Sequence, residues 1–269
     1  MLPDLHMHTC YSHDGAPHST VDALCQRAIE LGLPAIAITD HFDINRELAA
    51  TNVRTLPRNL IYRDVLAARE KYGDRLLVLH GVELGQAIAH PERSVELIGE
   101  LPYDIVLGSL HSIPGTKGFS HIDFTCVPKE SYNAYFAGVL DRTLDLLDLG
   151  VIHVVAHLTY IHRYLHKVGK TLDFPRFADG MTALFKKMIS LGVALEINTS
   201  TADDGITMPT REILLLYRDC GGRLLTIGSD AHKPESMAKG FAKTKEMIAS
   251  CGYTSLDVPT ASGILSFPL

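Results

Sequence analysis

Residues 4–8 read Asp4-Leu5-His6-Met7-His8, and this stretch begins the pattern from which the fold follows. In an extended strand, alternate side chains point to opposite faces, so His6 and His8 share one face while Leu5 and Met7 share the other. Two imidazoles then converge on one point, as they do in many metal sites. A hydrogen-bonded pair of buried histidines would show the same spacing, so the later strands must decide between these interpretations.

Six further short apolar runs follow, and segments of helical period separate them. Together with the first, the expected strands cover residues 4–8, 35–39, 76–82, 105–108, 152–156, 194–197 and 224–227. A helix is expected after a capping box of Ser19 and Asp22, with Gly32 as its stop, and others within residues 60–72, 130–149, 174–191, 210–220 and 240–251. Irregular loops are expected over residues 43–59, 87–99, 113–128 and 160–171. Strands that alternate with helices predict repeated βα units around a parallel sheet, and the 269 residues suffice for one large domain.

Each expected strand ends on a side chain of a type that binds metals. The residues at these ends are His6, His8, Asp40, His41, Glu83, His111, His157, Glu196, Asn198, Asp230 and His232. In a parallel barrel all strand ends open on one face, so these groups would meet there. A buried cluster of carboxylates and imidazoles carries costly charge unless a cation is bound, so the pattern predicts a divalent metal site. The mixture of nitrogen and oxygen donors suits Zn, Mn or Fe(II).

Composition and charge restrict the partners. The chain is 46% hydrophobic and 21% charged, with a net charge of -6, so it lacks the basic surface that long nucleic acids require, and we expect a small substrate. Its five cysteines are an odd number without CxxC spacing, which favours reduced thiols over a disulfide framework. No apolar run approaches 18 residues and no leader pattern is present, so we expect a cytoplasmic protein without a membrane partner, as a monomer or small homo-oligomer.

Six segments carry a resemblance to a known family. They are Asp4-Leu5-His6-Met7-His8-Thr9, Ile38-Thr39-Asp40-His41, Gly81-Val82-Glu83, Gly108-Ser109-Leu110-His111, Val155-Ala156-His157 and Gly228-Ser229-Asp230-Ala231-His232. In this order they resemble the signature segments of the PHP (polymerase and histidinol phosphatase) family, and the wider layout looks like its histidinol-phosphatase branch. The resemblance implies one α/β domain over residues 1–269, a distorted (β/α)7 barrel of TIM-like type with its metal site at the C-terminal ends of the strands.

The same resemblance implies three divalent ions, Zn, Mn or Fe and possibly a mixture. Carried over by position, the ligands are His6, His8, Glu83 and Asp230 for the first ion, Glu83, His111 and His157 for the second, and Asp14, His41 and His232 for the third. Many family members have histidine where Asp14 stands, and an aspartate favours a harder ion. Glu83, Asp230 and His232 are the expected catalytic residues.

Clustered divalent ions suit in-line displacement at phosphorus, with a metal-bridging hydroxide as the expected nucleophile. No GxSxG, GxxxxGK[ST] or GxGxxG motif points to a covalent serine, a nucleoside triphosphate or a dinucleotide instead. Arg163 is the candidate to bind the phosphate, although a solvated loop arginine is an equal interpretation. Asp40 is expected to accept a hydrogen bond from a liganding imidazole, or else to cap the loop that follows it.

The expected reaction is hydrolysis of a small phosphate monoester, and the branch resemblance favours L-histidinol phosphate as the substrate. Two alternatives stay open. One is a phosphoesterase of the same family that cleaves nucleotides or short oligonucleotide phosphodiesters. The other belongs to a different class: a metal-binding PHP module without activity, whose mark would be missing ligands.

Overall fold

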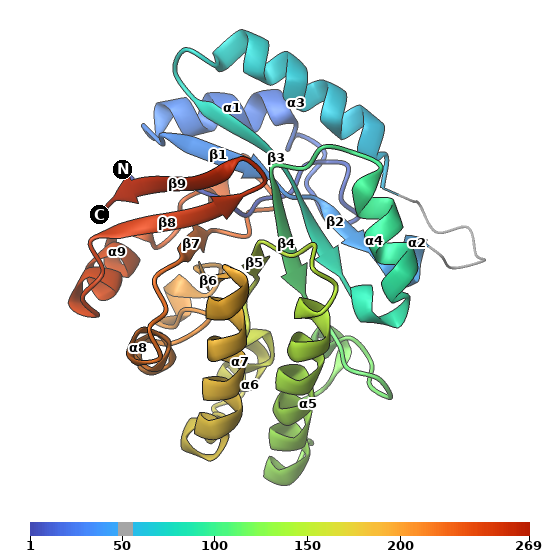
Figure 1. Cartoon of the computed structure of the whole chain (residues 1–269), viewed down its shortest axis with the longest axis vertical. Helices are drawn as coiled ribbons and strands as arrows, with labels where there is room; N and C mark the ends of the chain where they lie inside the picture. Colours follow the sequence, from blue (N-terminus) through green and yellow to red (C-terminus); the bar gives the residue numbers. More distant parts are fainter. Residues whose placement is uncertain (48–55) are drawn as a thin grey trace.

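Seven parallel strands form one curled sheet at the centre of the computed structural model, which describes residues 1–47 and 56–269 (Figure 1). The strands are β1 (Ala35–Ile38), β2 (His41–Asp43), β3 (Leu77–Gly85), β4 (Ile105–Ser109), β5 (Val154–Val155), β6 (Ala194–Asn198) and β7 (Leu225–Gly228). Their order is β1-β3-β4-β5-β6-β7, and β2 also pairs with β3. The parallel sheet predicted from the βα pattern is therefore present.

Residues 4–8 close the sheet into a distorted barrel. The Asp4 N–H donates to the carbonyl of Ala35, the first residue of β1, over 3.0 Å, and the Leu5 N–H donates to the carbonyl of Ile227 in β7, also over 3.0 Å. The segment thus lies between the two edge strands and joins them. Only isolated bridges form here, from Asp4 to Ile36 and from Met7 to Ala231, so the expected first strand was wrong as a regular element although its position was right.

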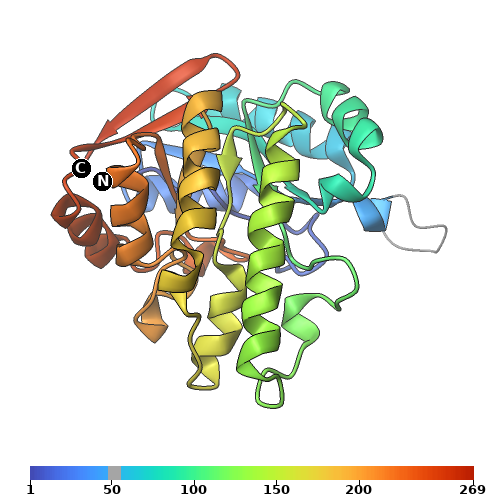
Figure 2. The same cartoon turned by 60° about the horizontal axis from the view of Figure 1, so that its bottom comes forward.

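Helices surround this sheet (Figures 1 and 2). They are α1 (Val21–Glu30), α2 (Ile44–Glu47), α3 (Arg58–Tyr72), α4 (Pro91–Gly99), α5 (Lys129–Leu147), α6 (Tyr160–Lys167), α7 (Ala178–Leu191), α8 (Arg211–Asp219) and α9 (Phe241–Ser250). Helix α1 is capped by Thr20, whose hydroxyl accepts a hydrogen bond from the Ala23 N–H over 3.1 Å. Its apolar positions Val21, Leu24 and Ala28 share one face and are buried. The expected cap, Ser19, was wrong by one residue, because its hydroxyl donates to the His8 carbonyl instead.

Some expected loops are partly helical. Helix α4 lies inside residues 87–99 and α6 inside residues 160–171, both of which we expected to be irregular. These helices have nine and eight residues, so their apolar period covers too few turns to stand out in the sequence. A short 3-10 helix, Ala87–Ala89, precedes α4 in the loop expected at 87–99, and another, Phe119–His121, lies in the loop expected at 113–128. Residues 48–55 of the loop expected at 43–59 lie outside the described residues.

A C-terminal hairpin was not predicted. Strand β8 (Ser255–Thr260) pairs antiparallel with β9 (Gly263–Pro268), and Leu256 and Val258 of β8 are fully buried. The alternation of these two apolar residues with polar neighbours was the available signal.

The core consists of apolar strand residues packed under the helices. Strand β1 is buried at all four positions, and Ile105, Val106 and Leu107 of β4 are equally covered. None of the helices in residues 1–47 and 56–269 combines the length and the apolar character needed to cross a bilayer. The rigid sheet fixes the ends of its strands, and those ends carry the polar residues described next.

Candidate metal centre and active site

The strand ends and the loop after residues 4–8 bring the nine predicted metal ligands together. A cavity of about 620 Å³ opens there, with Asp14, His41, His111, Asp230 and His232 in its wall. The other four residues, His6, His8, Glu83 and His157, are buried against this wall. Side chains up to 226 positions apart in the sequence, His6 and His232, therefore meet in one region, as the parallel barrel predicts.

Glu83, near the end of β3, lies at the centre of the cluster. Its Oε1 is 2.8 Å from His157 Nε2 and 3.1 Å from His111 Nε2. Its Oε2 is 2.5 Å from His41 Nδ1, 3.6 Å from His6 Nε2 and 3.7 Å from His8 Nε2. Burial favours the neutral carboxyl, but the surrounding histidines outweigh burial and hold the pKa of Glu83 well below its usual range. A carboxylate that faces imidazoles with both oxygens can bridge two cations.

Asp230 joins the two histidines of the first segment. Its Oδ1 is 3.2 Å from His8 Nε2 and 3.7 Å from His6 Nε2. Burial raises the pKa of Asp230, yet His6 and His8 outweigh that effect and keep the carboxylate ionised. The Asp230 backbone has φ of 54°, a left-handed conformation that is uncommon outside glycine and typical of constrained functional positions.

A third group lies toward solvent. The Asp14 Oδ2 is 3.5 Å from His41 Nε2 and 3.2 Å from His232 Nε2. The His232 Nδ1–H donates to the backbone carbonyl of Asp230 over 2.9 Å, which leaves its Nε2 facing Asp14. The His8 ring stacks on both His41 and His232, with centroids 4.1 and 4.2 Å away. The structure therefore brings Asp14 together with the two histidines with which the sequence grouped it.

The donor atoms of this cluster fit divalent cations. Within residues 1–47 and 56–269, His6 Nε2, His8 Nε2, His41 Nδ1 and Glu83 Oε2 are buried and, although they lie 2.5 to 3.7 Å from one another or from Asp230, make no hydrogen bond of regular geometry. Leaving buried polar atoms without a partner costs about 1–3 kcal/mol each, so this concentration of them in one place needs another explanation. Four groups of three side chains place one ligand atom each within 4.8 Å of the others: His8, His41 and His232; His6, Glu83 and His157; His6, His8 and Asp230; and His41, Asp43 and His111. Imidazole and carboxylate donors at this spacing could hold Zn, Mn or Fe(II).

Two further acids lie at the site: Asp43, which was not predicted there, and Glu196, which was predicted at a strand end without a ligand role. Asp43, at the end of β2, places Oδ1 3.5 Å from His111 Nδ1 and lines the cavity. Glu196, in β6, accepts a hydrogen bond from His6 Nδ1 over 2.6 Å. The position of Glu196 at an expected strand end indicated that it would lie near the site. No pattern in the sequence indicated that the Asp43 side chain would face it.

Asp40 does not make the contact that we expected. Its carboxylate accepts hydrogen bonds from the Thr9 N–H and hydroxyl and from the Ser12 hydroxyl, at 2.6 to 3.0 Å, and no imidazole in the described residues donates to it. The Ser12 Oγ lies 3.4 Å from His8 Nδ1. Asp40 thus reaches a site histidine only through Ser12, because the loop after residues 4–8 folds between them.

Arg163 reaches the cavity from α6, not from a loop. It lines the cavity with Tyr160 and Tyr164 of the same helix, and its Nη1 lies 3.8 Å from Asp230 Oδ2. The side chain is about a quarter exposed (27%), so part of the guanidinium faces the open space above the cluster. This position makes a direct contact with a bound anion possible.

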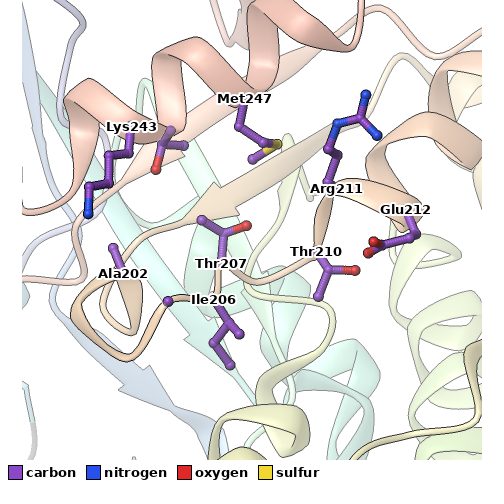
Figure 3. A pocket seen from close by; sticks show the side chains of 10 residues that line it. Ala202, Ile206, Thr207, Thr210, Arg211, Glu212, Lys243 and Met247 are labelled. Carbon is purple, nitrogen blue, oxygen red and sulfur yellow. The ribbon is translucent and has the colours of Figure 1, made fainter.

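A second cavity lies elsewhere, between the segment after β6 and helix α9 (Figure 3). Its volume is about 520 Å³, and Arg211 and Lys243 stand on opposite sides of it. Among its lining residues Glu212 is the one carboxylate and there is no histidine. This cavity therefore lacks the donor set that distinguishes the first.

Comparison with known proteins places the chain in a family. The model of the PHP domain matches residues 4–200. The probable histidinol-phosphatase of Clostridium acetobutylicum is 26% identical over 258 residues, which cover 93% of this chain and 94% of that protein. The histidinol-phosphatase of Lactococcus lactis subsp. lactis is 24% identical over 258 residues, 94% of this chain and 92% of that protein.

A solved structure shares the fold. It is histidinol phosphate phosphatase from Lactococcus lactis subsp. lactis complexed with zinc, L-histidinol and phosphate, and it superimposes with a TM-score of 0.82 at 21% identity, covering 98% of this chain and 100% of that one. The barrel expected from the sequence is thus the fold of a known enzyme. Because the domain model spans most of the sequence, the chain belongs to the PHP domain family.

Proposed function

We propose that this chain is a metal-dependent phosphatase that hydrolyses a small phosphate monoester, L-histidinol phosphate, to L-histidinol and phosphate. The observation that carries the proposal is Glu83, whose two oxygens face five imidazoles beside an open cavity. The names of the relatives, and the L-histidinol and phosphate bound in the related structure, support this substrate over others.

Three divalent ions are the proposed cofactors. Their ligands are His6, His8, Glu83 and Asp230 for the first, Glu83, His111 and His157 for the second, and Asp14, His41 and His232 for the third. Contacts of 2.8 to 3.7 Å between carboxylate oxygens and imidazole nitrogens within each set, and the buried donors without a hydrogen bond, support these assignments. Zinc in the related structure supports zinc here, and the same donors accept Mn or Fe.

The ions would supply Lewis-acid stabilisation of the phosphoryl oxygens and an acidified water. The chain supplies their geometry: Glu83 and Asp230 stay ionised in a buried setting, and the bond from His232 Nδ1 to the Asp230 carbonyl directs His232 Nε2 toward Asp14. Glu83, Asp230 and His232 are the proposed catalytic residues. Arg163 is proposed to bind the phosphate, since a guanidinium can donate two parallel hydrogen bonds to it.

The leaving group of L-histidinol phosphate carries an ammonium group, and the cavity contains a carboxylate, Asp43, that could attract it. Burial raises the pKa of Asp43, but His111 and His41 outweigh burial and lower it, so the carboxylate is charged. Its place in the cavity wall allows it to attract a cation.

We also propose that the enzyme acts in the cytoplasm as a monomer or small homo-oligomer, and that no long nucleic acid binds to a chain with a net charge of -6.

The test is phosphate release from L-histidinol phosphate by the metal-loaded protein. A nucleoside monophosphate, a 4-nitrophenyl phosphodiester and a sample treated with EDTA run beside it. We expect kcat/KM of about 10⁴ M⁻¹s⁻¹ or more for histidinol phosphate alone, lost on chelation.

Faster cleavage of the nucleotide or the diester would reject histidinol phosphate as the substrate and leave the metal site in place. No turnover of any compound by a protein that holds its metals would reject the enzyme and favour an inactive binding module.

A further inference from the structure

Glu196 is a buried acid that the proposed ligand sets do not use. It lies in β6, is 1% exposed, and both of its oxygens accept hydrogen bonds from the protein. Oε1 accepts from His6 Nδ1 over 2.6 Å, and Oε2 accepts from the backbone N–H of His157 over 2.7 Å. The side-chain amide of Asn198 donates to Oε2 over 3.3 Å. Because both oxygens are engaged, Glu196 is not placed to bind an ion itself.

The contact with His6 sets the direction of an imidazole lone pair. With its Nδ1–H given to Glu196, His6 keeps Nε2 as the free acceptor, and Nε2 faces Glu83 Oε2 at 3.6 Å and Asp230 Oδ1 at 3.7 Å. A carboxylate behind a liganding histidine fixes both the tautomer and the ring orientation, and raises the basicity of the ligand nitrogen.

The contact with His157 acts on the backbone. His157 has φ of 25°, outside the conformations that residues with a Cβ prefer. Such a conformation costs about 1–3 kcal/mol and persists only where the surroundings hold it. A hydrogen bond from the His157 N–H to a charged oxygen is a strong restraint, and it leaves His157 Nε2 2.8 Å from Glu83 Oε1.

The neighbouring strand makes room for this arrangement. A Cβ built on Gly228 of β7 would lie 2.3 Å from His6 Cβ and 2.7 Å from Glu196 Oε1. Only glycine therefore lets β7 approach while Glu196 and His6 keep their contact.

We infer that Glu196 is a positioning residue that holds one ligand of each of two proposed ions, the side chain of His6 for the first and the backbone of His157 for the second. The inference rests on the proposed ligand sets. One carboxylate in β6 thus couples residues 4–8 to the end of β5, across the metal centre. A change at this residue weakens binding of both ions without removing any ligand.

The test compares Glu196→Gln with wild type and with Glu212→Gln, which makes the same change in the second cavity. Glu196→Gln keeps the size of the side chain but turns one acceptor into an NH₂ donor, which must face either the His6 Nδ1–H or the His157 N–H. Zinc content is measured against a zinc-buffering chelator, in the absence of substrate. We expect Glu196→Gln to bind zinc about 10- to 100-fold more weakly and Glu212→Gln to match wild type.

A purely structural role would lower the thermal unfolding midpoint of the metal-free protein and leave zinc affinity and the cobalt(II) absorption spectrum unchanged. That result would overturn the inference. We expect the spectrum to change, and phosphatase activity, where present, to return at high zinc with an unaltered KM. Since zinc content and the cobalt spectrum need no substrate, they remain decisive if histidinol phosphate is not hydrolysed.

A second measurement needs no variant and covers the case in which Glu196→Gln does not fold. Long-range ¹H–¹⁵N correlation spectra of the zinc-loaded wild type identify which nitrogen of His6 carries its proton. A proton on Nδ1 is the expected result, and a proton on Nε2 would contradict the inference directly.

Discussion

Two buried histidines, His111 in the metal centre and His162 outside it, differ in the direction of their pKa shifts. His8 is the exception within the centre: burial and the neighbouring His41 and His232 lower its pKa. Burial favours the neutral form of His111, but Glu83 and Asp43 outweigh burial and raise its pKa to about 10. In His162 of α6 burial prevails, the nearby His166 adds to it, and the pKa falls to about 4. His80 of β3 behaves like His162: its ring stacks on Tyr103 at 4.4 Å, and burial lowers its pKa.

The difference lies in what faces the ring. His80 donates from Nδ1 to the Pro102 carbonyl over 3.0 Å, and His162 contacts the Thr171 hydroxyl at 3.3 Å, so neither meets a carboxylate of the described residues at hydrogen-bonding distance. The rings of the centre point ligand nitrogens at shared carboxylates. A buried histidine is therefore an ordinary core residue, and the carboxylate that several histidines share is the mark of a metal site.

The largest expected effect comes from removing that shared carboxylate. Glu83→Gln keeps the shape of the side chain but removes the negative charge that the histidines of the centre face and that His80 and His162 lack. We expect zinc content to fall at two of the three proposed ion positions and kcat/KM for histidinol phosphate to fall by about 10³-fold or more. Metal analysis and steady-state kinetics measure both.

The matched control is His80→Gln, which changes a buried histidine outside the centre. It should keep zinc content and stay within about 3-fold of wild-type kcat/KM, while losing about 1–3 kcal/mol of stability through the lost contact. If His80→Gln lost zinc, or if Glu83→Gln kept it, the distinction between the two kinds of histidine would be wrong.

Much of the centre could be predicted from the sequence because strand periodicity and parallel topology fix where strand ends point. His6, His111 and Asp230 stand at such ends, so their convergence needed only the βα pattern. The same reasoning overestimated the regularity of the first segment, since residues 4–8 close the barrel through isolated bridges instead of a regular strand.

Contacts made by loops and by acids beside the centre could not be predicted in this way. Asp40 turned toward Thr9 and Ser12 because a loop folds over it, and Asp43, at the end of β2, faces His111, after β4, across the intervening β3. Both depend on how side chains pack in three dimensions, which no spacing in the sequence encodes. Arg163 was placed correctly near the centre but on the wrong element, because α6 is too short to show its period.

An intermediate effect on kcat/KM is expected for Arg163, which lines the cavity but is not one of the proposed metal ligands. Arg163→Ala should lower kcat/KM by about 30- to 100-fold, the loss of one charge-assisted contact of about 2–3 kcal/mol with phosphate, while zinc content stays at the wild-type level. Arg211→Ala, in the second cavity, is the matched control and should leave both unchanged. Wild-type kinetics for Arg163→Ala would remove this residue from the proposed phosphate site.

The smallest expected effect concerns the stability that His162 contributes. Its pKa is about 4 in the folded protein and near 6.5 when unfolded, so the unfolded chain takes up the proton first as the pH falls. The contribution is complete above pH 6.5 and is lost between pH 6.5 and 4. The free energy of unfolding of both proteins is measured by urea titration of the metal-free forms at pH 7 and pH 4.5. Between these pH values the wild type should lose about 1 kcal/mol more than His162→Gln, which has no imidazole to protonate. If wild type and His162→Gln lost the same free energy of unfolding, water would reach the His162 ring. His162 would then not be a buried neutral histidine, and it could not serve as the contrast to the histidines of the centre.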